Sequence, residues 1–247
     1  MESIIKSKLA EIESVHGVRI LYACESGSRA WGFASPDSDY DVRFIYVHPQ
    51  EHYLRIDEMR DVIELPINEV LDINGWELRK ALRLFRKSNG PVFEWLQSPI
   101  VYQRDEAFHR DMHSIMSSHF SMRAMMHHYL SMAGTVVKGE LAGDEVKLKK
   151  YFYVLRPLLA CLWMIEHKDV PPMEFGKLRV LLQADLNTIV DELLTQKAKV
   201  NESFKIKPIF KLHDWFDVQM KTCEAQVPDA KTAAADDLNS IFRKYLS

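Results

Sequence analysis

The chain is poor in cysteine, with 3 in 247 residues. Cys24, Cys161 and Cys223 lie far apart and no CxxC pair occurs, so neither a zinc knuckle nor a disulfide framework is indicated. Widely spaced thiols are typical of proteins in a reducing compartment, and we therefore expect a cytoplasmic protein.

The sequence also lacks an excess of positive charge and any long hydrophobic run. Lys and Arg total 32 against 35 Asp and Glu, a formal net charge of -3. The chain as a whole is therefore not a basic nucleic-acid binder, although its net charge does not exclude a local basic groove. No window reaches the roughly 18–20 apolar residues of a membrane helix, and the first residues, MESIIKSKLAEIESVHG, do not resemble a signal peptide. We expect no membrane partner.

The first part of the chain mixes helix and strand patterns. Apolar residues from Ile4 to Val15 recur at helical spacing before Gly17, a suitable C-terminal cap. Buried or half-buried strands are predicted over residues 18–24, 40–47, 61–67 and 70–73. An amphipathic helix is predicted over 76–88, closed by Asn89-Gly90-Pro91.

After about residue 104 the patterns are helical and we expect no strand. The helix predicted from Val146 to His167 has Pro157 in its interior, where proline kinks a helix. The sequence thus predicts an α/β part at residues 1–103 and an all-helical part at residues 104–247.

One stretch, GSRAWGFASPDSDYDVR, carries the chemistry. Gly27-Ser28 follows a predicted strand and precedes a short helix, where backbone amides favour an anion such as phosphate. Ten residues separate Ser28 from Asp39. Asp39 and Asp41 at i and i+2 share one face of a strand, with Cα atoms about 6.6 Å apart. Paired carboxylates of this kind suit hard divalent cations such as Mg²⁺.

This pattern resembles the nucleotidyltransferase superfamily of DNA polymerase β. More narrowly, ESGSRAWGFASPDSDYDVRFIYV, LDINGWELRKALRLFRKSNGPVFEWLQSPIVY and KKYFYVLRPLLA resemble the bacterial predicted-nucleotidyltransferase family, some of whose members belong to RNA-repair pathways. The resemblance implies an α+β fold: a polymerase-β-type domain with a mixed sheet, followed by a helical domain that closes the nucleotide cleft. It also implies metal-dependent transfer of a nucleoside monophosphate from a nucleoside triphosphate, with ATP the favoured donor and two Mg²⁺ ions, or Mn²⁺, as cofactors.

The family uses a third acidic residue on a neighbouring strand. Asp72 lies between apolar residues before the predicted helix, within the family segment, and Glu64 in DVIELP is the alternative. We favour Asp72, which would bind metal or accept the proton of the attacking hydroxyl.

Other residues have both structural and functional interpretations. Arg29 could reach a triphosphate or form a salt bridge, and Arg43 shares the face of Asp39 and Asp41, where it would hold carboxylates ionised or contact phosphate. Trp31 is more often a core aromatic than a base-stacking residue. Lys80 belongs to a basic run that usually forms a solvated helix face.

A polar stripe on the later helix is a further candidate for nucleotide binding. Lys149, Tyr153 and Arg156 fall at i, i+4 and i+7, so they share one helix face. The two cations would meet the triphosphate, with Lys150 as a substitute for Lys149, and Tyr153 would contact the nucleoside. The alternative is a helix edge whose long side chains reach into solvent.

Arg123 and His128 have the R-x4-H spacing found in HEPN ribonucleases, but the match is short.

The sequence therefore predicts a nucleotidyltransferase in which Asp39, Asp41 and Asp72 are catalytic metal ligands. Gly27, Ser28, Arg29, Lys149, Tyr153 and Arg156 would bind the nucleotide. The sequence does not identify the acceptor, for which an RNA end, a protein side chain and a small molecule are the alternatives. A catalytically silent nucleotide-binding or antitoxin-like module is a rival, and the presence of both Asp39 and Asp41 argues against it. Neither the oligomeric state nor the nucleotide preference follows from the sequence.

Overall fold

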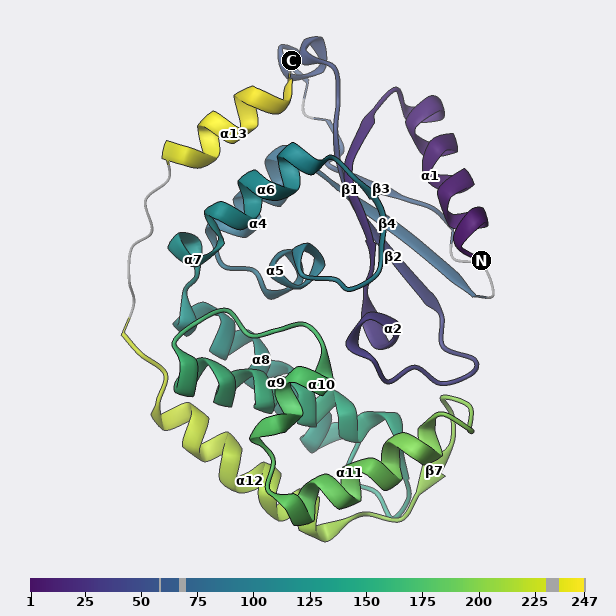
Figure 1. Ribbon diagram of the computed structural model, residues 1–247, viewed down its shortest axis with the longest axis vertical. Coiled ribbons are helices and arrows are strands. Elements are labelled where there is room, and N and C mark those ends of the chain that lie inside the picture. The colour runs from purple at the N-terminus through teal and green to yellow at the C-terminus, as the bar shows by residue number, and fades with distance from the viewer. Residues whose placement is uncertain (58, 67–69, 230–235, 247) are drawn as a thin grey trace. The chain divides into compact units, whose positions relative to one another are not determined.

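Figure 1 shows the computed structural model of the protein, which describes residues 1–57, 59–66, 70–229 and 236–246. Backbone contacts divide these residues into two units. The first holds the described parts of Met1–Ala30 and Asp39–His119 together with helix α13 (Asp236–Leu246). The second holds Trp31–Ser38 and residues 120–229. These units place residues 104–119 and α13 with the first unit, whereas the division predicted from sequence places them with the helical part.

A five-stranded mixed sheet forms the centre of the first unit, in the order β3-β4-β2-β1-β5. The strands are β1 (Arg19–Glu25), β2 (Tyr40–Val47), β3 (Val62–Glu64), β4 (Leu71–Glu77) and β5 (Val101–Arg104). β2 and β4 are parallel, and the other neighbouring pairs are antiparallel. The α+β fold class with a mixed sheet, expected from the sequence, is confirmed.

One face of this sheet is covered by helix α1 (Glu2–His16). Ile5, Leu9 and Ile12 are buried on it at helical spacing, in one cluster with alternate residues of β2 such as Val42 and Phe44. Alternation along a strand sends the intervening residues of β2 to the opposite face. The helix ends at Gly17 with φ of 59°, as its predicted cap requires.

The opposite face carries the helices α4 (Leu78–Arg86), α5 (Gly90–Leu96) and α6 (Glu106–Ser114) (Figure 1). Two short helices, α3 (Gln50–Tyr53) and α7 (Met116–His119), complete this unit with α13. Aromatic pairs hold this layer together: Trp76 of β4 lies 4.1 Å from Trp95, and Phe85 of α4 stacks on Phe93 at 4.6 Å, between ring centroids.

Several predicted boundaries shift. The helix predicted from residue 76 begins at Leu78, because Trp76 and Glu77 still pair with β2 and the carboxylate of Glu77 caps the helix by accepting from the backbone N–H of Lys80. β4 accordingly extends beyond the predicted 70–73. The strand predicted over 61–67 is Val62–Glu64, and residue 67 lies outside the described residues.

The second unit contains four long helices, among its described residues, and one short strand pair. The long helices are α8 (Met122–Gly139), α9 (Lys149–His167), α11 (Ala184–Lys197) and α12 (Phe210–Ala225). A short helix, α10 (Phe175–Leu178), and a 3-10 turn (Arg179–Leu181) lie between α9 and α11. In the part of the chain that the structure describes, no helix is long and apolar enough to cross a lipid bilayer.

The expectation that no strand follows residue 104 is wrong. β6 (Val146–Lys147) pairs with β7 (Lys205–Ile206), and α9 therefore begins at Lys149 rather than at Val146. Two residues per strand are too few to produce the alternation by which a strand is recognised in sequence.

Candidate active site

Gly27 brings the chain backbone against the carboxylate of Asp41. β1 ends at Glu25, and the chain then turns through Gly27, with φ of 59°, into the short helix α2 (Gly27–Trp31). A Cβ atom on Gly27 would lie 2.0 Å from Oδ2 of Asp41, closer than any side chain tolerates. Both the backbone conformation and the space therefore require glycine here.

Asp41 and Asp72 are neighbours across the parallel pair of β2 and β4. Arg43, two residues along β2, donates from Nη2 to Oδ1 of Asp41 at 3.1 Å and to Oδ2 of Asp72 at 2.7 Å. The side chains of Asp41 and Asp72 are 29% and 24% exposed, and that of Arg43 is 18% exposed. One guanidinium thus lies between two partly exposed carboxylates and offsets their mutual repulsion.

Asp39 lies one residue before β2, exposed to solvent. Its carbonyl accepts from Nε of Arg29 at 3.1 Å, and the guanidinium of Arg29 lies 3.8 Å from the ring centroid of Tyr40. The residues from Gly27 to Arg29 and the Asp39–Asp41 segment are therefore brought together at one end of the sheet.

Glu64, the alternative third carboxylate, lies elsewhere. It pairs with Asn74 on the edge strand β3, its side chain is 52% exposed, and Arg60 contacts it at 3.5 Å. β4 separates β3 from β2, so Asp72 is the nearer strand neighbour of Asp41. This register favours Asp72, whose catalytic role stays a prediction.

Glu25 is part of this site, and the sequence interpretation missed it. Its side chain is fully buried; Oε1 accepts from the backbone N–H of Asp41 at 2.8 Å, and Oε2 accepts from the hydroxyl of Tyr102. Burial raises the pKa of Glu25 above its usual value, although the hydrogen bonds from Tyr102 and Asp41 act in the opposite sense. A carboxylate at the end of the apolar strand VRILYAC was the available signal.

The loop between Gly27-Ser28 and Asp39 is held within the second unit. Lys197, only 2% exposed, donates to Oγ of Ser35 at 2.7 Å, and burial lowers its pKa. Ser38 donates to Oε1 of Glu202 at 2.7 Å, and Lys149 donates to Oε2 of the same carboxylate at 2.6 Å. Lys149, a predicted phosphate ligand, is therefore engaged with a carboxylate in this structure.

The other two residues of the predicted stripe surround Trp31. Tyr153 meets the indole edge to face with centroids 5.8 Å apart, and the guanidinium of Arg156 lies 4.7 Å from its ring centroid. Arg156 is 2% exposed and donates from Nε to the carbonyl of Met173 at 3.0 Å. These contacts support a structural role, and nucleotide binding by Tyr153 and Arg156 stays a prediction.

The oxygen atoms that this site offers as metal ligands are suited to a divalent cation, but the set is incomplete. Asp39 and Asp41 offer oxygen ligands, and Mg²⁺ takes one or two carboxylates while substrate phosphates and water complete its shell. Within the described residues, no preformed group of three His, Cys, Asp or Glu side chains is arranged to hold a metal ion. Arg43 holds the position between Asp41 and Asp72, so the substrate would have to supply the remaining oxygens.

Arg123 and His128, the pair with HEPN-like spacing, lie on α8 in the second unit. Arg123 donates to the carbonyl of Pro228 at 3.1 Å, and the ring of His128 lies 5.4 Å from that of Tyr129, between centroids. The structure thus gives both residues local contacts and adds no support for a nuclease site.

Comparison with known proteins gives three findings. A family model described as the RNA repair pathway DNA polymerase beta family, RlaP, matches residues 1–244. The uncharacterized protein YcgL of Bacillus subtilis (strain 168) is 43% identical over 249 residues, which cover 100% of this chain and 96% of that protein. A nucleotidyltransferase-like protein from Exiguobacterium sibiricum 255-15, solved by crystallography, is 14% identical with a TM-score of 0.33, covering 98% of this chain and 78% of that one. A score this low carries no functional argument.

Proposed function

The chain belongs to the RNA repair pathway DNA polymerase beta family, and on that basis we propose that it is a metal-dependent nucleotidyltransferase. It transfers a nucleoside monophosphate from a nucleoside triphosphate, with ATP the favoured donor, to an acceptor hydroxyl or phosphate. The observation that carries the proposal is the register of β2 and β4, which sets Asp41 beside Asp72 with Asp39 adjacent.

The reaction is an in-line displacement at the α-phosphorus. An acceptor oxygen forms a bond to that phosphorus, and the bond to the oxygen bridging the α- and β-phosphates breaks, so that its electron pair leaves on pyrophosphate. Asp72 accepts the proton when the acceptor is a hydroxyl. Positioning and charge neutralisation supply most of the rate enhancement.

Each residue of the site has a defined part in this scheme. Asp39 and Asp41 would hold Mg²⁺ or Mn²⁺ together with oxygens of the substrate, and Asp72 would complete the site as the proton acceptor, or as a third ligand if Arg43 moves from between it and Asp41. When bound, the cations would lower the negative charge of the triphosphate and of the departing pyrophosphate. Backbone amides at Gly27-Ser28, with Arg29, would hold the triphosphate, and Glu25 accepts a hydrogen bond from the backbone N–H of Asp41.

An RNA end is the acceptor that we favour, because the matching family model is described by an RNA repair pathway. The net charge of -3 disfavours a long duplex footprint, whereas it does not oppose binding of a single RNA end. A protein side chain and a small molecule are the alternatives, each with the same donor chemistry.

A labelling experiment separates these acceptors. The protein is incubated with each α-phosphate-labelled nucleoside triphosphate, Mg²⁺, and cellular RNA, protein or small molecules supplied separately. We expect label on RNA from ATP. Label only on protein or on a small molecule would overturn the RNA acceptor while leaving nucleotidyl transfer intact. No transfer to any acceptor, with no pyrophosphate release, would favour the silent nucleotide-binding module.

A further inference from the structure

A second surface of the first unit carries cations that the proposed reaction does not use. Arg79, Arg83 and Arg86 fall at i, i+4 and i+7 of α4, which places them on one face of that helix. They line a hollow of about 330 Å³ opposite α13. We call this hollow the α4–α13 groove.

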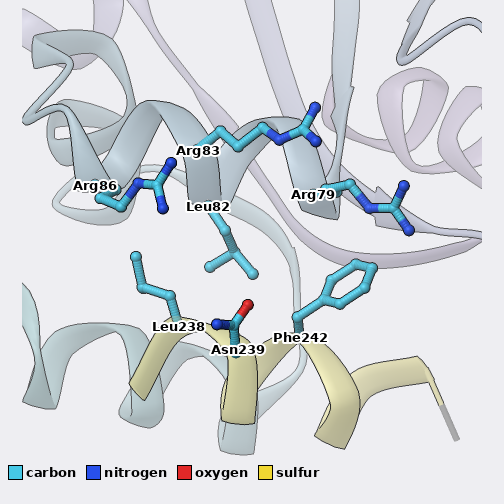
Figure 2. Close-up of a pocket in the computed structure, with 7 residues that line it drawn as sticks. All are labelled: Arg79, Leu82, Arg83, Arg86, Leu238, Asn239 and Phe242. Atoms are coloured by element: carbon cyan, nitrogen blue, oxygen red, sulfur yellow. The ribbon is translucent and has the colours of Figure 1, made fainter. Parts of the chain in front are cut away.

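Figure 2 shows how the groove is built. The arginines extend from α4, and α13 faces them with Asn239 and Phe242, while Leu82 of α4 points into the space between the two helices. Leu82 is 5% exposed, whereas Arg83 and Arg86 are exposed. The groove therefore has an apolar floor and a cationic rim.

Acidic side chains occur in an adjoining hollow, which Asp57, Asp61 and Glu77 line together with Arg79 and Arg83, but not in the lining of the α4–α13 groove itself. Arg43, Arg55, Arg60 and Lys80 each have an ion-pair partner in the first unit, and none of the residues lining the α4–α13 groove is acidic. Among the side chains that the structure describes, which do not include that of Asp236, Arg83 and Arg86 form no ion pair. Guanidinium groups without a carboxylate partner are suited to bind phosphate.

Aromatic rings adjoin these cations. The guanidinium of Arg79 lies 5.1 Å from the ring centroid of Tyr53 and 5.0 Å from that of Phe242. Arg79 and Arg83 also line a neighbouring hollow of about 390 Å³, which contains Tyr53 and Lys80 as well as the three carboxylates named above. Cations interleaved with aromatic faces are the arrangement that binds single-stranded nucleic acid, through its phosphates and by base stacking.

The spacing of the three arginines along α4 favours a ligand with several phosphate groups in a row over a ligand with one. From Arg79 to Arg86 the helix rises about 10 Å, and Figure 2 shows the three guanidinium groups spread apart along it, so that one phosphate group does not meet all three in this arrangement. A phosphorylated side chain would use one or two of them, whereas successive phosphodiesters would use the row.

We propose that the α4–α13 groove binds the sugar-phosphate backbone of a single-stranded RNA acceptor, away from its reacting end. The proposal rests on the proposed function for the identity of the strand. β4 connects the two places directly, since Asp72 lies near its start and α4 follows its end. The six residue steps from Asp72 to Leu78 span about 20 Å of extended strand, a distance that a few nucleotides bridge.

The test is RNA binding by an Arg83→Gln/Arg86→Gln variant, with a fluorescent oligouridylate of about 15 nucleotides as the probe. Each phosphate contact to a single strand contributes about 0.7 to the slope of log K against log salt. We expect the slope to fall by about 1.4 and affinity at about 0.1 M salt to fall by about 10- to 30-fold. The matched control is Lys6→Gln/Lys8→Gln on α1, which removes the same charge from the opposite face of the sheet and should bind like wild type.

The outcomes separate the groove from the catalytic proposal. An Asp39→Asn/Asp41→Asn variant should bind the probe as well as wild type does, because the groove is a separate surface. If Arg83→Gln/Arg86→Gln binds the probe with wild-type affinity, or if the α1 control loses as much affinity, the proposal that the groove binds RNA is contradicted. Binding of an oligodeoxythymidylate of the same length, or of a phosphoserine peptide, more than about tenfold tighter than RNA would overturn its assignment to RNA. If the groove variant loses RNA binding and the wild-type protein shows no nucleotidyl transfer, the proposal that the groove binds RNA is supported. The proposal that the protein is a nucleotidyltransferase is then contradicted.

Discussion

Gly27 and Asp41 are in direct contact: the position that a Cβ atom on Gly27 would take lies 2.0 Å from Oδ2 of Asp41. The turn that follows β1 and the carboxylate on β2 thus occupy adjoining space. Any side chain at residue 27 must displace the carboxylate. Glycine is therefore required at this position both by the space that Asp41 occupies and by the backbone conformation of the turn.

Gly27→Ala should therefore impair transfer more than stability. A left-handed φ costs an L-residue about 1–2 kcal/mol, and displacement of Asp41 by about 1 Å would lower activity by about 10²-fold. Gly17→Ala is the matched control, because Gly17 also has φ of 59° but nothing within 4 Å of the added Cβ. Thermal unfolding and turnover are measured for both variants. Equal activity in the two would contradict the steric account.

Asp72 and Glu64 are distinguished by strand position. Asp72→Asn should lower kcat by about 10²-fold or more, as expected for loss of a general base or metal ligand next to Asp41. Glu64→Gln should leave kcat unchanged, because Glu64 lies on the edge strand beyond β4. Full activity in Asp72→Asn with loss in Glu64→Gln would reverse the assignment.

Arg43→Gln should make the site more responsive to Mg²⁺. Without the guanidinium, the adjacent Asp41 and Asp72 carboxylates repel, and we expect Tm in metal-free buffer to fall by about 2–4 °C. Mg²⁺ should then raise Tm more in the variant than in wild type, because a bound cation offsets the same repulsion. Arg60→Gln, which removes an exposed arginine from the Glu64 pair, is the control. An equal Mg²⁺ response in all three proteins would refute a cation site at these carboxylates.

His48 gives the fold a dependence on pH. Burial, and secondarily the nearby His52, lower the pKa of His48 from 6.5 to about 4. A histidine whose folded-state pKa is lowered stabilises the fold above its unfolded pKa, and this contribution is lost as pH falls from about 6.5 toward 4. Because His48 is partly exposed, the loss should be about 1–2 kcal/mol. Urea unfolding at several pH values should show a weaker decline in His48→Gln, and an identical decline would contradict this origin.

The parts of the site that are local in sequence were predictable, and those that depend on strand order were not. The sequence placed Asp41 on a strand, as the structure has it, but it also placed Asp39 on that strand, whereas Asp39 lies one residue before β2. The choice between Asp72 and Glu64 depends on which strand lies beside β2, which is a tertiary property. Glu25 was missed because its partner groups, the Asp41 amide and Tyr102, come from distant segments. The start of α4 was misplaced because pairing with β2 keeps Trp76 and Glu77 in the sheet.

Mg²⁺-dependent pyrophosphate release from a nucleoside triphosphate, compared between wild type and Asp39→Asn/Asp41→Asn, tests the central claim most directly. The substitutions keep side-chain size and remove the two charges that would hold the cations, so unchanged Tm values would confirm that both proteins are folded. Our account predicts release by wild type in the presence of acceptor RNA, abolished by chelation and lowered by about 10³-fold or more in the variant. Release at the wild-type rate by the folded variant would contradict it.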